Sequence, residues 1–248
     1  MFKKLLHTNF FNKEIVLLSI FYLSLIVSFL FGENSTGGAI VDYVNQKKIS
    51  KQFALNFFDT LYIYDSYSTR HSPVLIIILS FFEKLNFSDY LIRLIHLHVC
   101  LLLPFFFYKC LSTKFEFVEK NILFLFSLLI FLSPTFRSLS IWPDSRIMGL
   151  LFFTLGVFFY LKFLKKESFK YVILNTFCIA CSAYFSPNFS LFSIFFVTNF
   201  VSHYGFKSQK VFLILLLNTI LAIPAIYFIF YEGVNFLSKT AAIGIDAN

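Results

Sequence analysis

Charged side chains are scarce in this sequence. Asp, Glu, Lys and Arg together make up 14% of the 248 residues, whereas hydrophobic residues make up 58% and the mean hydropathy is +0.77. Water cannot solvate that much apolar surface, so an ordinary soluble domain is excluded. The composition predicts an integral membrane protein, with residues 1–248 forming a single transmembrane core.

The sequence also lacks the short motifs of several enzyme classes. It contains no Walker A loop, G-x-G-x-x-G, H-E-x-x-H or G-x-S-x-G, which argues against nucleotide-driven chemistry and serine hydrolysis. Cysteine is rare, with four residues. Cys178 and Cys181 form a C-x-x-C inside an apolar run without a second pair, so core packing is favoured over zinc or redox chemistry. No disulfide is assigned.

The basic residues indicate topology. Lys and Arg number 21 against 13 acidic residues, which gives a formal charge of +8. Nucleic-acid binding would require one basic face, but here the basic residues form short clusters between apolar runs. We therefore expect no nucleic-acid partner. Such clusters are typical of the cytoplasmic loops of membrane proteins.

Hydropathy and charge together predict an all-α polytopic membrane protein with about seven transmembrane helices, its N-terminus inside and its C-terminus outside. A continuous helix over residues 171–204 would be about 51 Å long, too long for one crossing. Ser186 and Pro187 are expected to break it into a hairpin of two short helices. The expected spans are 15–31, 90–111, 118–134, 145–164, two within 171–204, and 211–231.

A polar stretch, residues 32–89, separates the first two apolar runs and is predicted to be an external catalytic loop. Its apolar run 74–82 is too short to span, and Pro73 is expected to start a juxtamembrane helix there. The candidates for chemistry in this loop are Asp42, Asp59, Asp65, Arg70 and His71.

Asp42 is the strongest of these candidates. It follows Gly37 and Gly38, which allow a tight turn, and a carboxylate held near the membrane surface can act as a general base. The alternative is an aspartate that is simply solvated in a loop.

Charged residues at the ends of spans are further candidates, because they are costly there unless they have a role. Arg93 lies at the outer end of the second span, where its guanidinium can bind a lipid phosphate or extend to the headgroups. Asp144 opens the fourth span, where a carboxylate favours the helix N-terminus and can serve a site. His96 and His98 are two positions apart, so they point to different faces and make a poor metal pair.

The order of these features resembles the GT-C class of membrane glycosyltransferases, which includes protein O-mannosyltransferases and the bacterial enzymes that add aminoarabinose to lipid A. One span precedes a long external loop with an early acidic residue. After this residue come a juxtamembrane helix, an Arg at the start of the second span, an Asp at the start of the fourth span and a broken pair of helices. The matching residues are Asp42, His71-Ser72-Pro73, Arg93, Trp142-Pro143-Asp144-Ser145 and the break at 184–188.

The resemblance implies a polyprenyl-phosphate sugar donor and transfer, with inversion, to a lipid, glycan or protein acceptor. Asp42 would then deprotonate the acceptor hydroxyl and Arg93 would offset charge on the leaving phosphate. Tyr43, His71 and Asp144 are the further substrate-binding candidates. Many relatives have an acidic pair where this chain has Asp42 and Tyr43, so a divalent metal ion stays an open cofactor.

The family's spread and the composition favour a bacterial inner membrane, with membrane lipids around the spans and the site on the periplasmic, extracytoplasmic face. Most GT-C enzymes continue through further spans and a soluble region. By this resemblance, the chain can be the N-terminal part of a longer protein. A lipid-linked oligosaccharide transporter or surface-polysaccharide polymerase is the rival function, and a small structural subunit is another. A transporter is expected to carry charges along the middle of its spans, whereas here they gather at the span ends.

Overall fold

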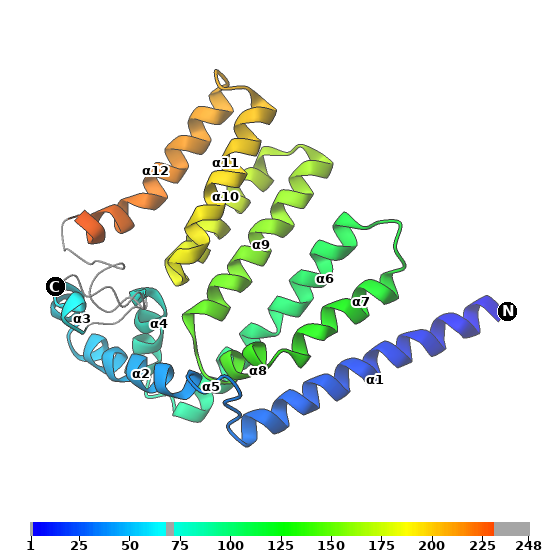
Figure 1. The fold of residues 1–248 in the computed structure, drawn as a ribbon, viewed down its shortest axis with the longest axis horizontal. Helices are drawn as coiled ribbons and strands as arrows, with labels where there is room; N and C mark the ends of the chain where they lie inside the picture. The colour runs from blue at the N-terminus through cyan, green and yellow to red at the C-terminus, as the bar shows by residue number, and fades with distance from the viewer. Residues whose placement is uncertain (1, 68–71, 231–248) are drawn as a thin grey trace, which may run out of the picture.

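The computed structural model describes residues 2–67 and 72–230, and these residues are helical almost throughout (Figure 1). The described ranges contain no strand, so the predicted all-α class is confirmed. The elements are α1 (Phe2–Leu30), α2 (Ala39–Leu55), α3 (Phe57–Tyr62), η1 (Tyr64–Tyr67), α4 (Pro73–Lys84), α5 (Asp89–Cys100), α6 (Leu102–Lys114), α7 (Lys120–Leu128), η2 (Leu129–Leu132), α8 (Pro134–Ile141), α9 (Ser145–Lys166), α10 (Phe169–Phe185), η3 (Pro187–Ser190), α11 (Leu191–Tyr204) and α12 (Gln209–Phe230).

Four helical segments are long and apolar enough to cross a membrane: Lys13–Leu30, Asp89–Lys114, Ser145–Lys166 and Gln209–Ile226. A fifth candidate is the pair Lys120–Leu132 and Pro134–Ile141, which is bent by 67°. The predicted helix break at Ser186 and Pro187 is confirmed, but α10 has 17 residues and α11 has 14, both shorter than a typical span. The described residues therefore show four or five helices of spanning length where the sequence predicts about seven.

Three lysine-bearing connections lie at one end of this helical bundle. The connections α6–α7, α9–α10 and α11–α12 are at the same end of the bundle as the beginning of α1 (Figure 1). Each connection carries or adjoins lysines, such as Lys114, Lys165 and Lys207. The opposite end holds α2, α3, α4 and α8 (Figure 1). Helix α2 carries Lys47, Lys48 and Lys51, so basic residues occur at both ends of the bundle.

The polar stretch 32–89 is mostly helical rather than an extended loop. The predicted helix at Pro73 is confirmed as α4, which Ser72 caps through the backbone N–H of Val74. The sequence did not predict α2, whose first turn carries Asp42 and whose buried face packs against α4. Arg137 falls in the connection between the expected spans 118–134 and 145–164, and that connection is not a simple loop, because Arg137 lies within α8.

Helices α9 and α10 pack closely through small and polar residues. Ser182 Oγ donates a hydrogen bond to the carbonyl of Gly149 at 2.7 Å, and Asn175 Nδ2 donates to that of Gly156 at 2.8 Å. A Cβ at Gly149 would lie 2.9 Å from Cβ of Ser186, so glycine is needed for this approach. These contacts fix the end of α10 beside the beginning of α9.

Candidate functional site

Asp42, Asp144 and Arg146 form a charged cluster where α2 meets α9. Asp144 is the N-cap of α9, as expected from its position, and its Oδ1 accepts from the backbone N–H of Arg146 at 2.7 Å. The same carboxylate accepts from Nε of Arg146 at 2.9 Å and from Nη2 at 2.7 Å. Nη2 also donates to Oδ2 of Asp42 at 3.0 Å. One guanidinium therefore joins carboxylates from two helices that are about 100 residues apart in the chain.

The three side chains of this cluster differ in exposure, which suggests different roles. Asp144 is 1% exposed, whereas Asp42 is 18% exposed and Arg146 is 49% exposed. The buried carboxylate holds the arginine in place through a two-point contact. Arg146 and Asp42 are the members that an incoming substrate can reach. Arg146 can bind an anion, and Asp42 can accept a proton.

Arg146 also lines a cavity of about 760 Å³ between α6, the η2–α8 turn, α9 and η3. Polar residues of the wall include Ser133, Ser186 and Asn188, and the rest of the wall is mainly apolar. The apolar lining comprises Leu103, Phe107, Cys110, Ile130, Phe136, Leu139, Ile147, Leu150, Phe153, Val157 and Phe189. From Arg146 to Val157 the wall follows α9 for about 16 Å, given about 1.5 Å per helical residue. Such a space suits an apolar chain whose anionic head lies at Arg146.

Tyr43, the neighbour of Asp42 on α2, is a fixed hydrogen-bond donor. Its side chain is buried, and its hydroxyl donates to Oδ1 of Asp89 at 2.6 Å. Burial, reinforced by the Asp89 carboxylate, raises the pKa of Tyr43 far above its usual range, so the hydroxyl stays protonated. Nζ of Lys47 lies 2.6 Å from the same Asp89 oxygen. These contacts tie α2 to the beginning of α5.

Arg93 is packed between aromatic rings. Its guanidinium carbon lies 3.5 Å from the ring centroid of Trp142 and 5.0 Å from that of Phe29. Nε donates to the carbonyl of Ile141 at 3.2 Å, and the buried Nη2 has no hydrogen-bond partner in the described part of the chain. Arg93, the predicted phosphate ligand, is not among the residues that line the large cavity, whereas Arg146 is.

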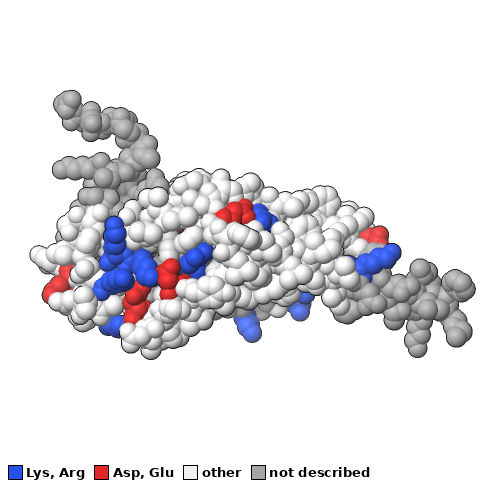
Figure 2. Space-filling model, turned by 90° about the horizontal axis from the view of Figure 1, so that it is seen from below, with Lys and Arg blue, Asp and Glu red and all other residues white. Residues whose placement is uncertain are grey.

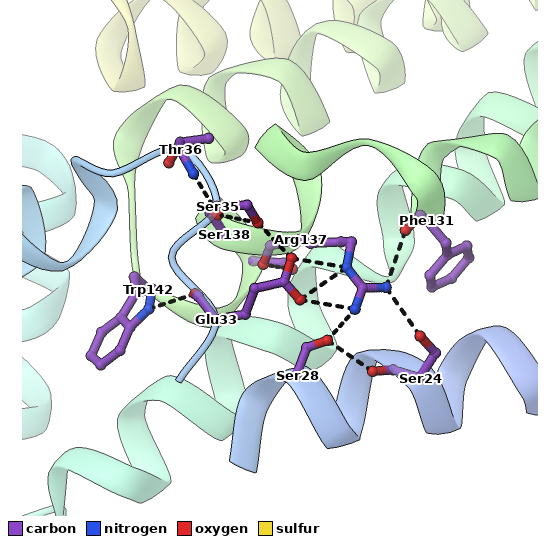
Figure 3. Close-up of polar contacts among 10 residues, drawn as sticks. Ser24, Ser28, Glu33, Ser35, Thr36, Phe131, Arg137, Ser138 and Trp142 are labelled. Carbon is purple, nitrogen blue, oxygen red and sulfur yellow. Dashed lines mark hydrogen bonds and ion pairs between the residues drawn. The ribbon is translucent and has the colours of Figure 1, made fainter. Parts of the chain in front are cut away.

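An ion pair between Glu33 and Arg137 holds the segment that leads into α2 (Figure 3). Nε of Arg137 lies 3.0 Å from Oε2 of Glu33, and Nη2 lies 2.8 Å from the same oxygen. Arg137 also donates to the hydroxyls of Ser24 and Ser28 on α1. The hydrogen bond from Arg137 lowers the pKa of Glu33 to about 2, with smaller help from Ser28 and Ser35.

Other contacts fix the same segment. Nε1 of Trp142 donates to the carbonyl of Glu33 at 3.0 Å, and the backbone N–H of Thr36 donates to Oγ of Ser138 at 3.3 Å. Figure 3 shows these contacts converging from α1, from α8 and from the segment before α2. Because this segment enters α2 directly, the network sets the position of Asp42 in its first turn. Sequence reasoning missed Glu33 in this role.

The remaining sequence candidates lie elsewhere or cannot be placed. His71 and Arg70 lie outside the described residues, as does the side chain of Asp65. Asp59 is on α3, where it accepts a hydrogen bond from Asn56 and does not contact the charged cluster.

The two histidines of α5 contact different partners. The ring of His96 contacts the carbonyl of Leu139 at 2.9 Å, and Nε2 of His98 lies 3.0 Å from the hydroxyl of Tyr22. The prediction that these histidines point to different faces is confirmed. Across residues 2–67 and 72–230, no group of three or more His, Cys, Asp or Glu side chains is arranged to hold a metal ion.

The function of this site has to be inferred from its geometry, because comparison with known proteins found no match. No protein-family model, curated protein or solved structure matches the chain. The arrangement itself combines a reachable carboxylate, a reachable guanidinium and an apolar cavity. These are the elements needed to bind an amphiphilic anion and to remove a proton beside it.

Proposed function

We propose that the protein is a membrane glycosyltransferase that moves a sugar from a polyprenyl-phosphate donor to an acceptor hydroxyl. The observation that supports this most directly is the contact of Asp42 with Arg146, a residue that lines the mainly apolar cavity. The prenyl chain would occupy the cavity and the phosphate would bind Arg146. The sugar would then lie beside Asp42, and no soluble domain is needed to bring the groups together.

The reaction is a displacement at the anomeric carbon. The donor phosphate takes the Nη2 donor that Asp42 uses in the unliganded protein, while Asp144 keeps its two-point hold on Arg146. Asp42 then accepts the proton of the acceptor hydroxyl as its oxygen attacks the sugar. The bond from the anomeric carbon to the phosphate oxygen breaks, and polyprenyl phosphate leaves with the electron pair. Arg146 offsets its charge, and attack opposite the leaving group inverts the configuration.

We further propose that the bent pair α7–α8 and the broken pair α10–α11 complete seven crossings, with the N-terminus cytoplasmic. The lysine-bearing connections at one end of the bundle support this orientation (Figure 1). The site then faces outward from a bacterial inner membrane. Reporter fusions ending at Lys166 and Asn188 are expected to report opposite sides, because one crossing separates them. The same side for both would contradict the hairpin.

The proposed transfer is tested with membranes that contain the full-length protein. They are supplied with labelled polyprenyl-phosphate sugars, and released polyprenyl phosphate is measured against membranes without the protein. A transferase releases the lipid phosphate, whereas a transporter moves the donor across the membrane unchanged. Absence of release with every donor of the pool, together with transfer of intact donor, would favour the transporter.

Arg146→Gln is expected to raise the donor KM about 10- to 100-fold, because charge-assisted hydrogen bonds to phosphate are lost. Some fall in kcat should accompany this change, since the leaving group loses its cation. Lys84→Gln is the control, because Lys84 is an exposed cation at the end of α4 and does not line the cavity. An unchanged donor KM in Arg146→Gln would show that Arg146 does not bind the donor phosphate.

A further inference from the structure

A second, smaller pocket lies on α2. It is separate from the cavity that Arg146 lines, which we call the donor cavity. It has a volume of about 360 Å³ and is lined by Tyr43, Val44, Lys47, Lys48, Lys51, Asp89 and Trp142. Positions 44, 47, 48 and 51 share one face of the helix, because they are three, four and seven residues apart. None of the lining residues of this α2 pocket also lines the donor cavity.

The α2 pocket has an excess of positive charge. Lys47 is paired with Asp89 at 2.6 Å and lies 3.8 Å from Glu83, so its charge is offset. Lys48 and Lys51 are exposed, and neither forms an ion pair within the described ranges. Figure 2 shows Lys and Arg side chains gathered at the end of the molecule that holds α2, with acidic side chains beside them. Two ammonium groups are thus available to a ligand.

Aromatic surface forms the other wall of the α2 pocket. The Trp142 ring stacks on the Arg93 guanidinium at 3.5 Å, and its centroid is 5.9 Å from that of Tyr43. Its indole N–H is already used by the carbonyl of Glu33. Trp142 is therefore held rigidly, and the pocket combines a fixed apolar wall with two mobile cations.

We propose that the α2 pocket is an anion site that binds a phosphate-bearing group, either free or in the headgroup of an anionic lipid. Lys48 and Lys51 are one helical turn apart, so both ammonium groups can reach the same phosphate. Helix α2 lies at one end of the bundle, where the long helices end, so lipid headgroups are an available source. This site does not depend on the proposed transferase activity, because it shares no lining residue with the donor cavity.

Trp142 gives a direct measurement, since it is the single tryptophan of the chain. The purified full-length protein in a neutral detergent is titrated with 4-nitrophenyl phosphate, whose nitroaromatic ring quenches tryptophan fluorescence on contact. We expect saturable quenching that weakens about tenfold in Lys48→Gln/Lys51→Gln, because two charge-assisted contacts are lost. Both residues are exposed, so the fold should persist. Lys84→Gln should titrate like the wild type, because Lys84 does not line the α2 pocket.

Competition identifies the source of the phosphate. Displacement of the probe by inorganic phosphate shows that the free anion suffices, whereas displacement only by phosphatidylglycerol nanodiscs, and not by phosphatidylcholine nanodiscs, shows a lipid headgroup. Either result supports the site. Quenching that is equal in the wild type and the double variant, or equal with neutral 4-nitrobenzyl alcohol as the probe, overturns it.

Discussion

Asp42→Asn is expected to reduce the release of polyprenyl phosphate about a thousandfold or more, while the protein stays folded in the membrane. An amide has nearly the shape of a carboxylate, and its oxygen can still accept the hydrogen bond that Arg146 donates at 3.0 Å. It cannot accept the acceptor's proton. The measurement is release from labelled donor in membranes with matched amounts of the wild-type and variant proteins.

The kinetic signature separates a base from a binding residue. Loss of the base lowers kcat with little change in the donor KM, whereas Arg146→Gln raises the donor KM. Asp59→Asn is the matched control, since Asp59 lies on α3 and contacts Asn56 rather than the charged cluster. Turnover that survives in Asp42→Asn would remove Asp42 from the role of base and make Asp144 the next carboxylate to test.

The features that the sequence predicted well have local signals. Pro73 starts α4, Asp144 caps α9, and the break after Phe185 coincides with Pro187. Each signal acts within a few residues, because it works through backbone geometry or an orphan N–H group. Hydropathy likewise identifies the long apolar helices without any knowledge of packing.

The features that the sequence did not predict depend on tertiary contacts. Helix α2 buries Gln46 and Ser50 beside Tyr43, Ile49 and Phe53, so its buried face is not a clean apolar stripe. No sequence motif identifies Arg146 as a ligand, and only the approach of α2 to α9 places it against Asp42. Glu33 and Arg137 are separated by 104 residues, a distance over which one sequence carries no pairing signal.

Arg137→Met is expected to lower the free energy of unfolding by about 2 kcal/mol, less than for breaking a fully buried ion pair, because water partly screens this one. The two side chains are 19% and 24% exposed, so the Glu33 carboxylate would lose its partner in a position that water reaches only in part. The hydroxyls of Ser24 and Ser28 lose their donor as well. Denaturation of the detergent-purified protein measures the change. Glu33→Gln/Arg137→Met should lose less than the sum of the single variants, because the second change removes the orphaned charge.

The pH dependence of this pair has a definite sign. The pKa of Glu33 falls from 4.5 to about 2 on folding, so its contribution to stability is complete above pH 4.5 and is lost as the pH falls towards 2. The wild type should therefore lose stability between pH 4.5 and 2 in a way that Arg137→Met does not, since the variant has no cation to lower that pKa. Identical pH profiles for the two proteins would show that other carboxylates govern acid stability.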